Sequence, residues 1–148
     1  MRHLTLLLAA LFAAIAAHAE PLWMRYPAIS PDGEKIAFTY KGSIYVVPSA
    51  GGQATRLTTT ECHNSLPVWS PDSKSLAYAS DRYGNYGIFI VSVDGGQPTR
   101  LTTHSAKEEP YAFSNDGKKV YYGASISDPA TSALFPKSSM GELYAVSV

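Results

Sequence analysis

The chain has 148 residues with 12 basic and 12 acidic side chains, so its formal net charge is zero. Because the basic residues are scattered, the sequence excludes the basic patch of a nucleic-acid-binding protein. Its only cysteine, Cys62, excludes a disulfide within the chain, so side-chain packing must stabilise the fold. We expect Cys62 to be a small buried hydrophobic residue.

The first segment, residues 1–19, has the layout of a secretory signal peptide. The charged residue Arg2 precedes an apolar run at 4–17, and the small-residue triplet 17–19 stands just before Glu20. The apolar run is shorter than the roughly 20 residues that a membrane-spanning helix needs. We therefore expect cleavage after residue 19, export to the periplasm or the extracellular space, and no membrane span after cleavage.

Two sequence blocks recur along the rest of the chain. The first is a short apolar segment followed by a turn of the Ser-Pro-Asp-Gly type, and its copies occupy residues 26–33, 66–73 and 110–117. The second has the pattern Gly-Gly-Gln-x-Thr-Arg-Leu-Thr-Thr and occupies residues 51–59 and 95–103. Self-similarity at intervals of about 40 residues is typical of stacked supersecondary units.

Within each copy, the segments read as short strands joined by tight turns. In the turn at 30–33, the proline sets φ, the aspartate can bond nearby backbone and the glycine accepts a positive φ. The next strand alternates large and small residues, as Ile36 and Phe38 do around Ala37. Because neither face carries much charge, we expect each sheet to be buried between neighbouring sheets. The second strand is predicted at 35–39, 75–80 and 118–123 in the three copies. The third strand is predicted at 44–47, 88–91 and 143–146. A fourth strand is predicted around 56–58 and 100–102 in the first two copies.

The connections between these strands differ among the copies. The glycine pairs at 51–52 and 95–96 suit the positive-φ turns of two-residue hairpins. The second copy has four extra residues, which we place in a loop at 81–87 that replaces the shorter segment 40–43. In the second copy Ser73 takes the place of the turn glycine.

Four short antiparallel strands in a unit of about 40 residues match the size of a propeller blade. The sequence therefore predicts an all-β fold, a β-propeller fragment with about three four-stranded antiparallel blades, of which the last is incomplete. The predicted propeller spans 20–148, with blade repeats at about 26–65, 66–109 and 110–148. A non-repetitive β-sandwich is the alternative, because short strands with turn signals occur in both classes.

The turn motif, the Ala-Phe or Ala-Tyr strand after it, the loop at 80–85 and the Gly-Gly block resemble the Pro-Asp variety of WD-like propeller repeats. Such repeats occur in the TolB translocation protein and in the N-terminal propellers of tricorn-type serine peptidases, relatives of the C-terminal processing peptidases. The tricorn type is favoured because the repeat begins at Tyr26, which leaves no room for the α/β domain that precedes a TolB propeller. The opening at 22–33 and the long loop at 127–144 are also similar to exported tricorn-type proteins.

The resemblance implies a non-catalytic module. In that family the propeller guides or gates peptides toward a separate proteolytic part, and the resemblance places no catalytic residue within this chain. The expected function is thus that of a propeller segment of an exported serine peptidase, with a peptide or protein substrate, or other domains of its parent chain, as partners. The alternatives are a TolB-like periplasmic interaction propeller and the propeller part of a prolyl-oligopeptidase-type hydrolase.

The residues themselves predict no catalytic, cofactor-binding or metal-binding site. The string at 123–127 lacks the second glycine of a nucleophile elbow. Cys62 and His63 are adjacent in an extended segment, so their side chains should point to opposite sides. His63 and His104 occupy non-equivalent positions of the repeat and have no cluster of further ligands.

The glycine pairs have no helix after them and so make no phosphate cradle. We expect Asp81 and Arg82 to form an ordinary exposed ion pair. Loops on a rigid scaffold commonly carry binding, so the loops at 81–87 and 127–141 are the expected places for a partner contact.

Overall fold

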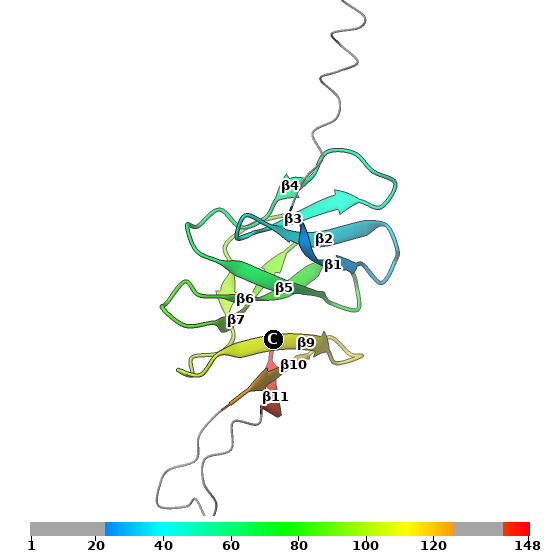
Figure 1. The fold of residues 1–148 in the computed structure, drawn as a ribbon. Coiled ribbons are helices and arrows are strands. Elements are labelled where there is room, and N and C mark those ends of the chain that lie inside the picture. Colours follow the sequence, from blue (N-terminus) through cyan, green and yellow to red (C-terminus); the bar gives the residue numbers. More distant parts are fainter. Residues whose placement is uncertain (1–22, 126–140) are drawn as a thin grey trace, which may run out of the picture.

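The structure, a computed structural model, describes residues 23–125 and 141–148 (Figure 1). These residues form three antiparallel sheets. The first sheet consists of β1 (Arg25–Ile29), β2 (Lys35–Tyr40), β3 (Ser43–Pro48) and β4 (Thr55–Arg56). The second consists of β5 (Asn64–Trp69), β6 (Ser75–Ser80), β7 (Gly87–Ser92) and β8 (Thr99–Arg100). The third consists of β9 (Glu108–Phe113), β10 (Lys119–Ala124) and β11 (Glu142–Ser147).

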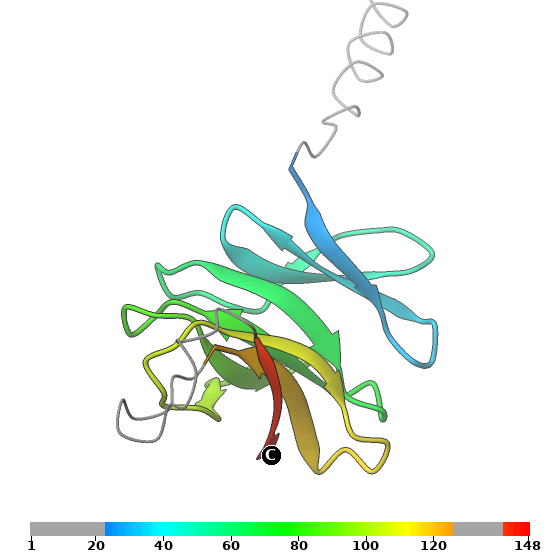
Figure 2. The same cartoon turned by 60° about the horizontal axis from the view of Figure 1, so that its bottom comes forward.

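Within each sheet the strands follow one another in chain order, so every blade is a simple meander. The sheets form three stacked layers, seen from the side in Figure 1 and tilted in Figure 2. The first strands lie side by side from layer to layer, β1 against β5 and β5 against β9. Each of the first two sheets has four strands, and the third sheet has three among the described residues. The predictions of an all-β blade architecture and of an incomplete third blade are therefore confirmed.

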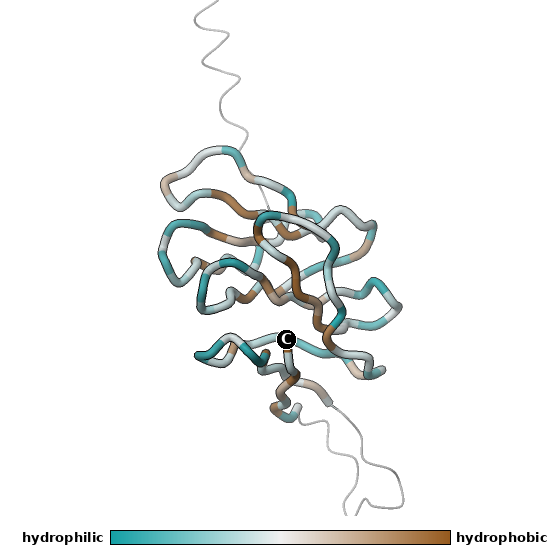
Figure 3. The backbone as a smooth tube through the Cα atoms, turned by 180° about the vertical axis from the view of Figure 1, so that it is seen from behind, coloured by the Kyte–Doolittle hydropathy of each residue, from teal (hydrophilic) through white to brown (hydrophobic). Residues whose placement is uncertain are grey.

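Two apolar cores lie between the layers, because each strand sends alternate side chains to opposite faces. Leu76 and Tyr78 of β6 pack toward the first sheet, whereas Ala77 between them packs toward the third. The prediction that the sheets are buried on both faces is confirmed for the second sheet. Figure 3 shows the apolar stretches along the strands and the hydrophilic ones in the loops.

The Pro-Asp turns have the geometry that their sequence predicts. Gly33 and Gly117 adopt φ angles of 76° and 71°, and Ser73 adopts 59° at the equivalent position. Asp32 Oδ1 accepts a hydrogen bond from the backbone N–H of Glu34 at 3.0 Å. The same turn therefore forms in all three copies, even where a serine must take up the left-handed conformation.

The hairpin prediction at the glycine pairs is wrong. Residues 49–54 connect β3 to β4 and residues 93–98 connect β7 to β8, so these are longer loops. The glycines do have positive φ angles, but Gly51 is the last residue of a turn closed by its N–H and the Pro48 carbonyl. A two-residue turn occurs instead between β2 and β3, where Lys41 and Gly42 have φ angles of 48° and 75°.

The insertion in the second copy lies where the sequence placed it. The β6–β7 loop occupies 81–86, four residues more than the two-residue turn between β2 and β3. The same connection in the third sheet includes the predicted partner loop at 127–141, of which only residue 141 is described. The predicted signal peptide lies outside the described residues. No helix among the described residues has the length and apolar character needed to cross a bilayer.

Candidate functional site

A groove of about 530 Å³ opens between the first and second sheets, at the end where the short β2–β3 turn lies. Its walls come from the start of β1, the end of β2, the turn itself and the residue before β5. The lining residues are Trp23, Arg25, Thr39, Tyr40, Lys41, Gly42 and His63.

Strand pairing decides which side chains face this groove. Arg25 is directly opposite Thr39 in the β1–β2 pair, and Thr39 is opposite Ile44 in the β2–β3 pair. Directly opposed residues share one face of a sheet. Since Ile44 belongs to the core between the first two sheets, Arg25 and Thr39 also face the second sheet.

Asn64 holds the second sheet against the turn. Its backbone N–H and its side-chain Nδ2 both donate to the Gly42 carbonyl, each at 2.9 Å. The floor and the far wall of the groove are therefore fixed relative to each other by two hydrogen bonds from one residue.

Thr39 is the most deeply buried residue of the groove that carries a side-chain polar atom. It is only 4% exposed, and its Oγ1 has no hydrogen-bond partner. A buried hydroxyl group without a partner costs about 1–3 kcal/mol of desolvation. A ligand that supplied the missing hydrogen bond would recover this cost.

Positive charge and aromatic rings surround the opening. The guanidinium of Arg25 lies 5.8 Å from the centre of the Trp23 ring, and Lys41 Nζ lies 5.4 Å from the Tyr40 ring. None of the described residues that line the groove is a carboxylate. The groove therefore favours an anionic ligand with an apolar or aromatic portion.

The β6–β7 loop supports the far wall. Asp81 Oδ1 accepts a hydrogen bond from the His63 backbone N–H at 2.7 Å, and the Asp81 N–H donates to the His63 carbonyl at 3.2 Å. The hydroxyl of Tyr86 lies 3.0 Å from His63 Nδ1. The loop thus holds His63 from both its backbone and its ring.

The expected Asp81–Arg82 ion pair is not found in the described part of the chain. Asp81 is engaged by His63, whereas the Arg82 guanidinium lies 5.1 Å from the centre of the Phe89 ring. Burial raises the pKa of Tyr78 to about 12, and the positive charge of nearby Arg82 opposes that rise. Arg82 therefore packs inward over the aromatic core rather than out toward Asp81.

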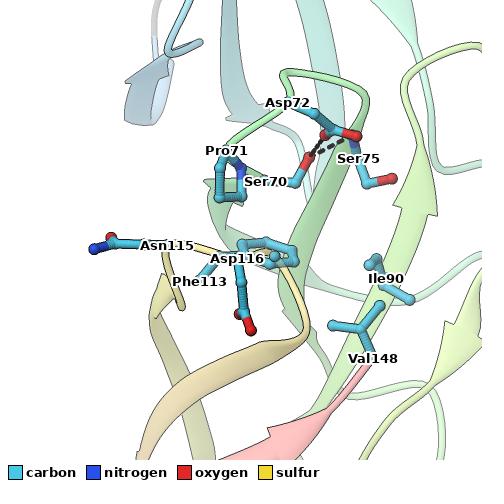
Figure 4. A pocket seen from close by; sticks show the side chains of 10 residues that line it. Ser70, Pro71, Asp72, Ser75, Ile90, Phe113, Asn115, Asp116 and Val148 are labelled. Carbon is cyan, nitrogen blue, oxygen red and sulfur yellow. Dashed lines mark hydrogen bonds between the residues drawn. The ribbon is translucent and has the colours of Figure 1, made fainter.

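A second hollow of about 460 Å³ lies at the opposite turns, between the second and third sheets (Figure 4). Both of its aspartates have local partners: Ser70 Oγ donates to Asp72 Oδ1 at 2.6 Å, and Ser114 Oγ donates to Asp116 Oδ1 at 2.6 Å. These hydrogen bonds hold the pKa of both aspartates below its usual value. The hollow therefore offers a ligand fewer free polar groups than the groove does.

Cys62, His63 and His104, the residues whose types could carry chemistry, do not form a shared site. Cys62 is half-buried, and its Sγ lies 3.5 Å from both Asn64 Oδ1 and Ser80 Oγ, so the expectation of a hydrophobic role is wrong. His63 contacts Tyr86 instead of the thiol, and His104 Nδ1 accepts from the Ala106 N–H at 3.0 Å. Among residues 23–125 and 141–148, no group of three or more His, Cys, Asp or Glu side chains is arranged to hold a metal ion.

The sequence singled out His63 and the loop at 81–87 but not Trp23, Arg25, Thr39 or Lys41. A signal for Trp23 alone exists in the repeat. Positions 23, 63 and 107, just ahead of the three first strands, carry tryptophan, histidine and lysine. A repeated position whose residue type changes so widely is not set by blade packing.

Residues 21–147 match the family described as the tricorn protease N-terminal β-propeller domain. This chain belongs to that family. It is 35% identical over 66 residues to tricorn protease homolog 1 of Streptomyces coelicolor, a stretch covering 45% of this chain and 6% of that protein.

Two solved structures share the fold of this tricorn propeller segment. A putative TolB from Agrobacterium tumefaciens is 30% identical with a TM-score of 0.65, and the match covers 72% of this chain and 40% of that one. The tricorn protease is 18% identical with a TM-score of 0.63, covering 88% of this chain and 14% of that one. The chain thus spans less than half the length of the relatives that it matches.

Proposed function

We propose that this chain is the non-catalytic N-terminal propeller segment of an exported tricorn-like serine peptidase, in which it guides or gates peptide substrates. The observation that carries the proposal is the family match over residues 21–147, together with three sheets that stack as consecutive blades. The proteolytic step would belong to a domain outside this chain. The groove between the first two blades gives the segment a surface on which a peptide can lie.

Export is part of the proposal. It is supported by the signal-peptide layout of residues 1–19 and by the likeness to TolB and tricorn proteins. Its test is the N-terminal sequence of the protein recovered from the periplasm or the medium, which should begin at Glu20. Recovery of a chain that keeps residues 1–19 in the cytoplasm would contradict export.

A TolB-like interaction propeller is the second candidate, because the putative TolB structure has 30% identity and a TM-score of 0.65. The two functions differ in hydrolysis. The complete protein that contains this segment should cleave peptides if it is a peptidase, whereas residues 1–148 alone should cleave none. Binding of a protein partner without any cleavage by the complete protein would favour the TolB-like function. Turnover by residues 1–148 that a single Ser or Cys substitution abolishes would contradict the non-catalytic role.

A further inference from the structure

The groove between the first two blades carries features that blade packing does not require. Thr39 stands where the second and third sheets have Ala79 and Gly123, because all three are paired in the same register with the following strand. Arg25 likewise stands where the other sheets have Ser65 and Glu109. A propeller blade can therefore be built at this position without either the hydroxyl or the guanidinium group.

The burial of Thr39 makes its hydroxyl group a costly choice for the fold alone. At 4% exposure, Oγ1 lacks both bulk water and a protein partner. An alanine such as Ala79, which is 1% exposed at the equivalent position, avoids this cost. The unpartnered hydroxyl group is therefore an argument for a ligand that reaches Thr39 through the groove.

The charges around Thr39 define the chemistry of that ligand. Arg25 and Lys41 place two fixed positive charges on the lining, and no described lining residue is acidic. By contrast, the lysine at the corresponding end of the third sheet, Lys107, is paired with Glu109 at 2.6 Å. Within the described part of the chain neither Arg25 nor Lys41 forms an ion pair, so both can meet an anion that comes from outside.

Access to the groove depends on the length of one turn. The β2–β3 connection has only Lys41 and Gly42, and both residues line the groove at this end. Between the second and third sheets, the longer loop at 81–86 occupies the corresponding place, where Asn85 Nδ2 donates to the His104 carbonyl at 2.8 Å. The short turn therefore leaves the first inter-blade groove open at this end.

We propose that this groove binds an acidic segment of a peptide: Thr39 Oγ1 donates to a carboxylate that Arg25 and Lys41 neutralise, and Trp23 packs against the neighbouring residue. Trp23 is 74% exposed and supplies a large apolar surface at the edge of the groove. The choice of a peptide as the ligand rests on the proposed function, whereas the choice of a carboxylate rests on the lining residues. The groove would then select acidic peptides among those that reach the propeller.

The test measures binding of a fluorescein-labelled peptide with a run of glutamates to the complete protein, by fluorescence polarisation. The matched probe has glutamines in place of the glutamates. We expect the acidic probe to bind at least about tenfold more tightly than the neutral one, and more weakly as salt is added. Equal binding of the two probes, or binding that is insensitive to salt, would overturn the proposal.

Variants locate the site. Arg25→Gln and Lys41→Gln should each weaken binding of the acidic probe about tenfold or less, since each removes one exposed charge. Lys74→Gln, at the opposite turn of the second sheet, is the matched control and should leave the affinity unchanged. If Lys74→Gln weakens binding as much as the other two do, the effect comes from overall charge and the groove is not the site.

Thr39→Val separates a binding role from a structural one, because valine keeps the shape and removes only the hydroxyl group. We expect weaker binding of the acidic probe together with a higher melting temperature, since a buried unpartnered group is lost. A lower melting temperature with unchanged affinity would show that the hydroxyl serves the fold and would overturn the proposal.

The outcome also separates this inference from the proposed function. A complete protein that cleaves peptides but does not prefer the acidic probe contradicts the groove assignment and leaves the peptidase function standing. A complete protein that binds the acidic probe through Arg25 and Lys41 but cleaves nothing contradicts the peptidase function and supports the groove assignment.

Discussion

The hydroxyl group of Thr102 donates a hydrogen bond to Oε2 of Glu108 across the boundary between the second and third sheets. Thr102 Oγ1 in turn accepts a hydrogen bond from the backbone N–H of Ile88 at 2.8 Å. At the preceding boundary Thr58 has the equivalent place, accepting from the Ile44 N–H at 2.9 Å and from Asn64 Nδ2 at 3.4 Å. Each of the first two blades is thus joined to the next through a threonine that lies just after its fourth strand.

Glu108 gives this junction a dependence on pH. The residue is fully buried, and its Oε1 has no partner. Burial raises the pKa of its carboxyl group, while the Thr102 hydrogen bond and the nearby His104 and Arg100 side chains oppose that rise. The folded state therefore holds this proton more tightly than the unfolded state, so stability falls as pH rises from the ordinary pKa of glutamate through the raised one.

Glu108→Gln should remove the loss of stability that ionisation of Glu108 causes as pH rises. We expect the variant to be more stable than the wild type at pH 8 by about 1 kcal/mol, with a smaller difference near pH 4, where Glu108 is protonated. Asn64 shows that an amide suits the equivalent position, because its Nδ2 donates to the Gly42 carbonyl. Urea unfolding at a series of pH values checks this, and identical pH profiles for the two proteins would contradict it.

The hydrogen bond from Ser70 should control the pKa of Asp72. Ser70 Oγ donates to Asp72 Oδ1 at 2.6 Å and is the main cause of the lowered pKa, helped by the Lys74 N–H at 3.1 Å. Ser70→Ala should raise the pKa of Asp72 toward its ordinary value, as measured by NMR titration of the carboxyl carbon. Asp116, lowered in the same way by Ser114, is the internal control and should not move.

The lowered pKa of Asp72 makes the stability of the protein depend on pH in acid. A carboxylate whose folded pKa is lowered stabilises the protein above its ordinary pKa and loses that contribution as pH falls through the lowered value. The wild type should therefore lose stability below about pH 4, and Ser70→Ala should lose less over the same interval. An unchanged Asp72 pKa in the variant would show that the serine hydroxyl has no part in it.

Much of this architecture follows from the sequence, because its signals are local. The second strands predicted at 35–39, 75–80 and 118–123 lie within a residue of β2, β6 and β10 at each end. The turn residues fix backbone angles by their own chemistry, so recurring turns reveal recurring blades. The alternation around Ala77 was enough to predict that both faces of a sheet are buried.

The groove and the blade junctions were not predictable in the same way. Thr39 looks like an ordinary strand residue, and its unpartnered hydroxyl becomes evident only when the second sheet is packed against it. Glu108 and Glu109 are adjacent and of the same type, with no local signal that distinguishes them, yet Glu108 is fully buried while Glu109 is not. Properties that depend on contacts between blades 40 residues apart leave no local pattern in the chain.

Trp69 should be sensitive to substitution, because it joins the first inter-blade core to the first sheet by a hydrogen bond. Its Nε1–H donates to the Ala28 carbonyl of the first sheet at 2.8 Å, and its ring is 7% exposed. Trp69→Phe removes this hydrogen bond and part of the ring volume, so we expect a loss of about 1–3 kcal/mol in the free energy of unfolding. Phe113 at the equivalent position of the third sheet shows that phenylalanine suits the strand itself.

The matched control is Trp23→Phe, because Trp23 is 74% exposed and outside both cores. Its effect on urea unfolding should be within about 0.5 kcal/mol. If both variants lost the same free energy of unfolding, the hydrogen bond from Trp69 to Ala28 and the packing of the Trp69 ring would add no measurable stability.

The outer face of the third sheet should make residues 1–148 self-associate. Leu143 is 68% exposed, although Ile88 and Ile44, its equivalents in the second and first sheets, are fully buried against the next layer. Tyr121 on the same face is 37% exposed. An apolar sheet face of this kind is a site for association.

Leu143→Glu should therefore reduce self-association in sedimentation velocity experiments without lowering the melting temperature, since little buried surface is lost. Ile88→Glu is the matched opposite case: the same substitution at a fully buried equivalent should unfold the protein. If Leu143→Glu associates as strongly as the wild type, the contact lies elsewhere. The edge of β11, an edge strand of its sheet among the described residues, is then a candidate, because open strand edges pair through the backbone and are indifferent to a side chain on the sheet face.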